Sequence, residues 1–370
     1  MPKKETATET RGFCSIGKYL QGPGEIKKLP HYAGMYGSVT VALIDPFFMG
    51  LEEELTEKFA SEGQKLHVVR FMGECSDEEI ERVTGIAKDT KASCIVGIGG
   101  GKTLDTARAV GPALDIAEIL CPTAASCDAP TSGLSVIYRA DHTCRPVIYK
   151  KHPEYVLVDT DIIIEAPPRM LAAGIGDALA TYFEAVTTQA ANNVNNFGDG
   201  YAQTLTGMAI ARLCFDTLLA KGEEAYHANC MHLRTQAFED IVEANTLMSG
   251  LGTENTGCNI SHGLSTALAT IPDTHHKTHG ETVAFGVLCQ LIMENADQEL
   301  FDEVYLLCKN VGLPVCLADL GITENVEEKI RAAMEYGVAN KEILRIPVYP
   351  VTAERLYNAV MFVDSLKDKY

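Results

Sequence analysis

The sequence predicts an α/β protein in which a domain built on a parallel β-sheet is followed by an all-α domain. Short apolar runs alternate with helical stretches as far as residues 161–168, and such alternation is typical of a parallel sheet. Beyond that point almost every stretch has helical periodicity. A chain of 370 residues with 46% apolar content suffices for two domains. We therefore expect domains at residues 1–164 and 165–370.

In the first domain, strands are expected where apolar and β-branched residues form short runs. These runs lie at residues 39–44, 66–71, 92–98, 118–122 and 155–159. Helices are expected at residues 51–61 and 77–90. Residues 134–138 and 145–149 predict a β-hairpin, which is either a surface decoration or a lid over a cofactor.

Glycines follow the third expected strand and lead directly into a helix, in the run Gly97-x-Gly99-Gly100-Gly101-Lys102. Residues without side chains let the backbone approach a pyrophosphate, and the amides of a helix N-terminus attract the anion. Lys102 stands where G-x-G-x-x-G requires its last glycine. The run therefore indicates either a phosphate or dinucleotide site or a plain strand-to-helix turn.

Two further features of this domain point to a ligand at the ends of its strands. Asp45 ends the first strand, where an acidic residue can accept hydrogen bonds from ribose hydroxyls, and it favours NAD over NADP. A long polar loop at residues 123–133, which contains Ser126 and Asp128, follows the strand at 118–122. Ligand sites are often found in such loops.

The second domain is expected to be helical throughout. Its predicted helices lie at residues 170–185, 201–219, 223–248, 259–270, 281–293, 300–311, 326–336 and 352–365. Four of the ten histidines fall within residues 262–279. His262 lies on one expected helix and His279 at the start of the next, so both could face one cavity.

Histidines in this arrangement are typical metal ligands. Neutral imidazole suits zinc and other borderline cations, and a catalytic site usually takes three protein ligands. Asp177 is a lone carboxylate in an otherwise apolar helix, where burial without a partner would be costly. From the residues alone, Asp177 is either a third ligand or a helix cap. His275 and His276 are either solvated loop residues or proton relays.

Composition excludes several classes of partner. The formal charge of -19 argues against nucleic acid and against an anionic membrane surface. No apolar run approaches the roughly 18 residues of a membrane span. The twelve cysteines are scattered, with no C-x-x-C and no signal peptide, which predicts reduced thiols in a cytoplasmic protein.

Four motifs carry a resemblance to a known family. They are Gly-Ile-Gly-Gly-Gly-Lys-Thr-Leu-Asp-Thr-Ala at 97–107, residues 122–132 with 134–138, Gly-Asp-Ala-Leu-Ala-Thr at 176–181, and His-His-x-x-His-Gly-Glu-x-Val-Ala-Phe-Gly at 275–286. The sequence resembles the glycerol dehydrogenases of the metal-dependent, so-called iron-containing, alcohol dehydrogenase superfamily over nearly its whole length. The resemblance implies a Rossmann-like dinucleotide-binding domain followed by a metal-binding domain, in a dehydroquinate synthase-like architecture.

The resemblance also assigns residues. It implies that Asp177, His262 and His279 bind the metal and that Asp128 lies beside the substrate. It also implies that the following residues bind NAD: Asp45, Gly101, Lys102, Asp105, Thr123, Ser132, Leu134 and Tyr138. To these we add Gly99 and Gly100 of the glycine run and Ser126 of the polar loop.

Two departures from the family pattern bear on metal and substrate. Iron-dependent relatives carry a histidine where this chain has Thr181, which favours zinc, with another divalent metal possible. Residues 253–257 are Thr-Glu-Asn-Thr-Gly in place of the usual Phe-Glu-Ser-Gly-Gly. The substrate pocket is therefore expected to be more polar, and the identity of the diol stays open.

The expected activity is NAD-dependent, zinc-assisted oxidation of glycerol or a related vicinal diol to the ketone, by hydride transfer to nicotinamide C4. The expected partner is a small polyol or hydroxy-ketone, and the enzyme is expected to be a homo-oligomer. One alternative is a lyase resembling dehydroquinate synthase, although such enzymes need several basic residues and the region from His262 to His279 offers only Lys277. The other is a non-catalytic NAD-binding sensor.

Overall fold

The computed structural model describes residues 7–139, 144–340 and 349–369. The chain divides into two compact units, and each is described by itself. The α/β unit consists of Ser15–Ala125 and Ala129–Ala166. The helical unit consists of Met1–Cys14, Ser126–Asp128 and Pro167–Tyr370. The division near residue 166 lies beside the expected boundary at 164, and the two short segments of the helical unit were not foreseen.

The α/β unit is built on a six-stranded sheet with the order β1-β8-β5-β4-β2-β3, in which every pairing is parallel. The strands are β1 Lys18–Gly22, β2 Val39–Ile44, β3 Lys65–Arg70, β4 Cys94–Gly99, β5 Ala117–Pro122 and β8 Tyr155–Asp159. The predicted parallel α/β fold is confirmed. Strand β1 was not among the expected strands, and it lies at the edge of the sheet.

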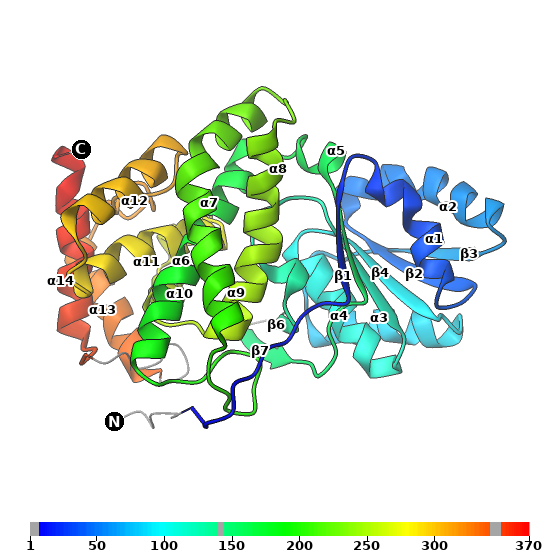
Figure 1. Cartoon of the computed structure of the whole chain (residues 1–370), viewed down its shortest axis with the longest axis horizontal. Helices are drawn as coiled ribbons and strands as arrows, with labels where there is room; N and C mark the ends of the chain where they lie inside the picture. Colours follow the sequence, from blue (N-terminus) through cyan, green and yellow to red (C-terminus); the bar gives the residue numbers. More distant parts are fainter. Residues whose placement is uncertain (1–6, 140–143, 341–348, 370) are drawn as a thin grey trace. The chain divides into compact units, whose positions relative to one another are not determined.

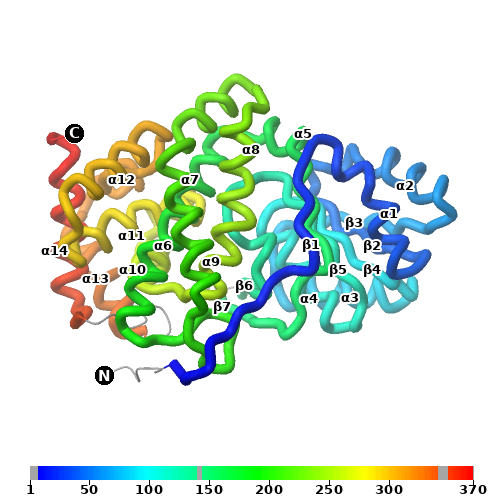
Figure 2. Tube along the Cα trace, in the orientation of Figure 1, coloured from blue at the N-terminus to red at the C-terminus, as the bar shows by residue number. Residues whose placement is uncertain are grey.

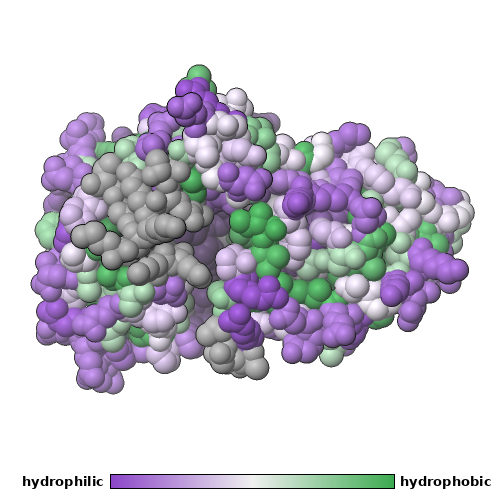
Figure 3. Space-filling model, turned by 90° about the horizontal axis from the view of Figure 1, so that it is seen from below, coloured by the Kyte–Doolittle hydropathy of each residue, from purple (hydrophilic) through white to green (hydrophobic). Residues whose placement is uncertain are grey.

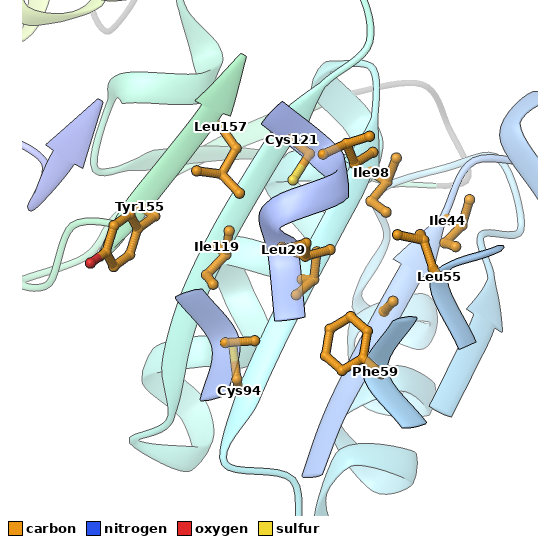
Figure 4. Packing of buried hydrophobic residues seen from close by; sticks show 14 of the residues in the cluster. Leu29, Ile44, Leu55, Phe59, Cys94, Ile98, Ile119, Cys121, Tyr155 and Leu157 are labelled. Carbon is orange, nitrogen blue, oxygen red and sulfur yellow. The ribbon is translucent and has the colours of Figure 1, made fainter. Parts of the chain in front are cut away.

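Helices cover both faces of this sheet. They are α1 Leu29–Gly34, α2 Glu52–Ser61, α3 Asp77–Asp89, α4 Gly101–Leu114 and the short α5 Thr160–Ile163. Alternate residues of β4, among them Cys94 and Ile98, point into a core with Leu29 of α1 and Phe59 of α2 (Figure 4). Helices α3 and α4 contact each other and strands β2, β4 and β5. The inner strands β2, β4, β5 and β8 are buried along nearly all of their length because both faces of the sheet are covered.

The predicted hairpin is also present. Strands β6 Leu134–Tyr138 and β7 Cys144–Ile148 pair antiparallel as a separate two-stranded sheet. The residues that join them, 140–143, lie outside the described residues. Strand β6 contacts α4, so the hairpin is anchored on the helix that follows the glycine run.

The helical unit is organised around α6. Its helices are α6 Pro168–Ala190, α7 Leu205–Cys230, α8 Gln236–Glu243, α9 Ser249–Thr256, α10 Ile260–Leu268, α11 His279–Met293, α12 Gln298–Asn310, α13 Val326–Ala339 and α14 Ala353–Ser365. Helix α6 is buried along most of its length and contacts α7, α9, α10 and α11 (Figure 1). An all-helical second unit is therefore confirmed.

The predicted single helix at residues 223–248 is wrong. Helix α7 ends at Cys230, His232 adopts a left-handed φ of 53°, and the chain returns along α8 (Figure 2). The Thr235 side chain caps α8 by accepting from the backbone N–H of Phe238. The turn contains neither Gly nor Pro, so Thr235 was the signal that could have located it. A π-helical turn, Ala244–Met248, then leads into α9.

Hydrophilic residues cover much of the face in Figure 3, in agreement with the formal charge of -19. Within the described part of the chain, no helix is long and apolar enough to cross a membrane.

Candidate active site

Two glycines bring helices α6 and α11 of the helical unit into backbone contact. A Cβ on Gly280 would lie 1.8 Å from the carbonyl oxygen of Ala173, and a Cβ on Gly176 would lie 2.5 Å from that of Gly280. A side chain at either position would push the two helices apart, so they approach this closely only because both residues are glycine. Asp177 follows one glycine and His279 precedes the other. The crossing therefore places these two predicted ligands side by side.

The three predicted metal ligands do meet. Asp177 Oδ1 lies 3.4 Å from His262 Nε2 and 3.4 Å from His279 Nε2. Neighbouring ligand atoms in a tetrahedral zinc shell, with bonds of about 2.0–2.1 Å, are about 3.3 Å apart. Asp177 is 1% exposed, and its Oδ1 has no hydrogen-bond partner among the described residues. A buried oxygen of this kind is costly unless a cation sits beside it, so the residues fit a metal.

The opposite side of the His262 ring is held by Glu184, which the sequence analysis missed. The His262 backbone N–H donates to Glu184 Oε1 at 3.0 Å, and His262 Nδ1 lies 2.6 Å from Glu184 Oε2. Burial alone would lower the pKa of His262, but the Glu184 carboxylate and other negative neighbours raise it well above its ordinary value. The signal for Glu184 was its spacing, because residues seven apart on a helix share a face.

A second set of metal-ligating groups shares His262. Ligand atoms of Glu184, Cys258 and His262 also lie within 4.8 Å of one another. In this set Glu184 already holds Nδ1 at hydrogen-bond distance, and Asn196 Nδ2 donates to Cys258 Sγ. The set with Asp177 leaves Nε2 open and is therefore the better candidate. His275 and His276 belong to neither set.

Asp128 lies beside these ligands, as expected for a residue near the substrate. Its backbone N–H donates to Asp177 Oδ2 at 3.2 Å, and its carboxylate accepts from the Thr253 side chain. Burial, with the nearby Asp177 charge adding to it, raises the pKa of Asp128 to about 7. The Thr253 hydroxyl also lies 3.0 Å from the Thr181 hydroxyl. The Thr181 hydroxyl in turn lies 3.0 Å from the Ser249 hydroxyl. A chain of hydroxyls thus ends on Asp128.

In the α/β unit, the predicted cofactor residues gather at the carboxyl edge of the sheet. Strand order reverses at β2, because β3 lies on one side of it and β4 on the other. Asp45 follows β2, the glycine run follows β4, and Thr123, which follows β5, donates its backbone N–H to Gly99 O at 3.1 Å. Ligands of open α/β sheets bind at such a reversal point.

The glycine run leaves a cradle at the start of α4. Gly99 has a φ of 159°, and a Cβ on it would lie 2.9 Å from Asp45 Cβ. Gly100 is the N-cap residue of α4, and no side chain caps the helix there. A Cβ built on Gly100 would meet no atom within 4 Å, so the space in front of the helix is open. The first amides of α4, from Gly101 onward, therefore have no side-chain cap and are placed to bind an anion. The cradle fits the pyrophosphate of a dinucleotide.

Other predicted cofactor residues already have partners within the unit. Lys102 Nζ lies 2.7 Å from Glu74 and 4.9 Å from the centre of the Tyr138 ring. Ser132 Oγ lies 3.4 Å from the carbonyl oxygen of Leu134, at the start of β6. The cofactor contacts of these residues stay predictions. Ser126 belongs to the helical unit, and its role stays a prediction too.

A buried arginine that the sequence did not single out braces the loop before β6. Arg108 is 0% exposed and donates to Asp105 Oδ1, Leu134 O and Ala129 O at 2.8, 2.7 and 2.6 Å. The other oxygen of Asp105 accepts from the Val136 N–H. Burial, opposed by Arg108, raises the pKa of Asp105 to about 6. Asp105 is thus occupied within the protein, and its predicted contact with NAD stays a prediction.

Glu118 of β5 is a second acidic neighbour of Arg108, and it has fewer hydrogen bonds than Asp105. It is 1% exposed, its nearest contact to Arg108 is 3.7 Å long, and neither carboxylate oxygen has a hydrogen-bond partner among the described residues. Burial, opposed by Arg108, raises the pKa of Glu118 to about 7. The other charged or titratable groups that act on it are Glu154, Lys151 and His152.

Comparison with known proteins agrees with this fold. A profile of the family described as iron-containing alcohol dehydrogenase matches residues 17–160. A glycerol dehydrogenase from Pseudomonas putida is 42% identical over 96% of this chain and 98% of its own length.

Two solved structures are similar over nearly the whole chain. A probable glycerol dehydrogenase from Sinorhizobium meliloti superposes with a TM-score of 0.90 and 38% identity, over 97% of this chain and 100% of that one. The glycerol dehydrogenase from Schizosaccharomyces pombe gives a TM-score of 0.92 and 31% identity, over 98% of this chain and 93% of that one.

A parallel sheet with an anion cradle at its reversal point, and three metal-binding side chains in the helical unit, suit a metal-dependent enzyme that uses a nucleotide cofactor. The chain belongs to the iron-containing alcohol dehydrogenase family. It is an NAD-dependent, metal-containing alcohol dehydrogenase.

Proposed function

We propose that the chain oxidises glycerol, or a closely related vicinal polyol, to the hydroxy-ketone with NAD, using zinc held by Asp177, His262 and His279. The observation that carries the proposal is the position of Asp177 Oδ1, which is buried, has no hydrogen-bond partner in the part of the chain that the structure describes, and lies 3.4 Å from Nε2 of both imidazoles. The substrate follows from the relatives, several of which are named glycerol dehydrogenase. Family membership does not favour the lyase or the sensor.

Zinc is preferred over iron because the site has three protein ligands. Thr181, which stands where iron-dependent relatives carry a histidine, is 1% exposed and bonded to Ser249 and Thr253. Helix α9 also packs closely there, because a Cβ on Gly252 would lie 2.5 Å from Thr181 Cγ2. A fourth imidazole has no room. Three ligands with an open position are typical of catalytic zinc.

When bound, the metal supplies a Lewis acid that favours loss of the proton from the substrate hydroxyl, and NAD accepts the hydride. Asp177, His262 and His279 fix where the reacting hydroxyl binds. Asp128, held by the Thr253 hydroxyl, accepts a hydrogen bond from the second hydroxyl of the diol. In the α/β unit, the α4 amides bind the pyrophosphate and Asp45 binds the adenosine ribose.

Cytoplasmic location and homo-oligomeric assembly stay predictions. All twelve cysteines are free thiols, which suits a reducing compartment.

The test measures metal content and NADH formation in parallel for Asp177→Ala, His262→Ala, His279→Ala and the matched control His276→Ala. Each ligand variant should lose zinc and turnover while still binding NADH, because the cradle for the cofactor lies in the α/β unit. His276→Ala should retain both zinc and activity. Stoichiometric zinc at wild-type affinity in Asp177→Ala would overturn the metal assignment, and equal rates with glycerol and ethanol would overturn the polyol assignment.

A further inference from the structure

Glu184 is a buried carboxylate whose two oxygens both serve one residue. It is 0% exposed and lies on α6, two turns after Asp177. One oxygen accepts from the His262 backbone N–H at 3.0 Å, and the other lies 2.6 Å from His262 Nδ1. Burying a carboxylate costs free energy unless its oxygens are hydrogen-bonded, and here His262 provides a partner for each of them, so the role of Glu184 must be sought at His262.

The contact at Nδ1 determines how the imidazole is protonated. A carboxylate only accepts hydrogen bonds, so Nδ1 must carry a proton. In the neutral ring, Nε2 is then left with its lone pair, and Nε2 is the atom 3.4 Å from Asp177 Oδ1. The hydrogen bond from the backbone N–H to the other oxygen prevents the carboxylate from turning away.

We propose that Glu184 is a positioning residue that fixes the tautomer and orientation of His262 and thereby sets the affinity of the metal site. The proposal rests on the proposed function, because it requires His262 to be a metal ligand. Carboxylates that orient a metal-bound histidine in this way typically change metal affinity by about 10- to 100-fold when they are removed. Glu184 acts through His262 and touches neither metal nor substrate.

Glu184→Gln separates this role from a structural one. Glutamine has nearly the same shape, but its amide offers one acceptor and one donor to the two N–H groups of His262. The best pairing moves the imidazole proton to Nε2, so that Nδ1 accepts from the amide. The fold is then kept, but the lone pair that the metal requires is lost. A purely structural carboxylate would not produce this effect.

Glu294→Gln is the matched control. Glu294 is a partly buried carboxylate of the same unit, at the end of α11. The Thr187 hydroxyl, Gln290 Nε2 and the Tyr349 hydroxyl all donate to its Oε1. Since glutamine retains such an oxygen, this variant removes a buried charge without removing an acceptor. It should leave the zinc affinity unchanged.

The experiment measures the zinc dissociation constant of metal-free full-length protein by competition with a chromophoric chelator, together with the Tm of the metal-free form. Glu184→Gln should raise the dissociation constant about 10- to 100-fold with little change in that Tm. Wild-type affinity in Glu184→Gln would overturn the proposal. If Glu184→Gln folds poorly, Glu184→Asp, which is too short to reach Nδ1, must show the same loss of affinity, and wild-type affinity there would overturn the proposal.

Two further variants identify which idea fails. If Asp177→Ala retains zinc at wild-type affinity, the metal assignment itself is wrong and the role of Glu184 falls with it. If Asp177→Ala loses zinc but Glu184→Gln does not, only the positioning role is wrong. Cys258→Ser tests the competing set of Glu184, Cys258 and His262. Loss of zinc affinity in Cys258→Ser would favour that set, in which Glu184 is itself a ligand, and would thereby overturn the positioning role.

Discussion

Replacing Gly176 by alanine should damage the metal site while sparing the fold. The new Cβ would lie 2.5 Å from the carbonyl oxygen of Gly280 and 2.9 Å from Ala284 Cβ. To reach an ordinary separation of about 3.4 Å, helices α6 and α11 must move apart by about 0.9 Å at this point. Asp177 moves with α6 and His279 with α11. The separation between their ligand atoms would then exceed the present 3.4 Å.

The energies indicate that the unit survives this change. Overpacking a core typically costs about 1–3 kcal/mol, and alanine gains about 1 kcal/mol over glycine inside a helix. The free energy of unfolding should therefore fall by about 0–2 kcal/mol, which is small beside the roughly 5–15 kcal/mol by which a typical domain is stable. A displacement of about 1 Å at a catalytic site, however, costs about 100-fold in rate. Activity should therefore fall far more than stability.

The assay compares zinc affinity, kcat/KM with glycerol and Tm for Gly176→Ala and for the control Gly222→Ala. Gly222 lies on α7, and the nearest atom to its added Cβ is the tip of the Leu307 side chain at 3.0 Å, which can move at little cost. The control should behave like wild type. If Gly176→Ala keeps full zinc affinity and full activity, the backbone contact between α6 and α11 does not determine the geometry of the ligands.

Three more predictions concern charge and specificity. The pKa of Glu118 is raised from 4.5 to about 7, so the native state binds the extra proton, and its contribution to stability should fall as pH rises from 4.5 to 7. Glu118→Gln should remove that part of the pH dependence of unfolding, and an unchanged profile would show that Glu118 is ionised throughout. Asp45→Ser keeps a side-chain cap for the following turn but removes the charge, and should raise the NADP-to-NAD ratio of kcat/KM at least about tenfold. An unchanged ratio would show that Asp45 does not face the ribose. Thr253→Val removes the hydroxyl bonded to Asp128 and should lower kcat/KM for glycerol about tenfold, with a smaller effect on ethanol. Equal losses for both alcohols would contradict a role in recognising the second hydroxyl.

Five strands of the six-stranded sheet were predictable because each contains a short run of apolar residues bounded by polar turn residues. Strand β2 begins and ends at the predicted residues, and β3, β4, β5 and β8 begin and end within two residues of them. The end of α7 was not predictable in the same way, because nothing in the turn after Cys230 breaks a helix by itself. There the helix ends in a local turn, in which His232 is left-handed and the Leu233 backbone N–H donates to Ala228 O at 2.9 Å.

The three proposed metal ligands could be selected from the sequence because their chemistry is rare in such surroundings. Asp177 stands alone in an apolar helix, and His262 and His279 belong to a histidine cluster. Glu184 and Arg108 were missed because glutamate and arginine are common on exposed helix faces, and only tertiary packing decides that both are fully buried. Their roles depend on partners more than twenty residues away along the chain.

One face of α6 explains why the site has the form it does. Asp177, Thr181 and Glu184 are spaced four and three residues apart, so their side chains lie along one stripe of the helix. The first offers an oxygen to the metal position, the second bonds to hydroxyls of the α9 segment, and the third holds His262 of α10. Since Thr181 occupies the central position and α9 packs against it at Gly252, the stripe can supply one ligand but not two. In the proposed metal site the remaining two ligands therefore come from α10 and α11, and the glycine contact at Gly176 lets α11 approach closely enough to place His279 beside Asp177.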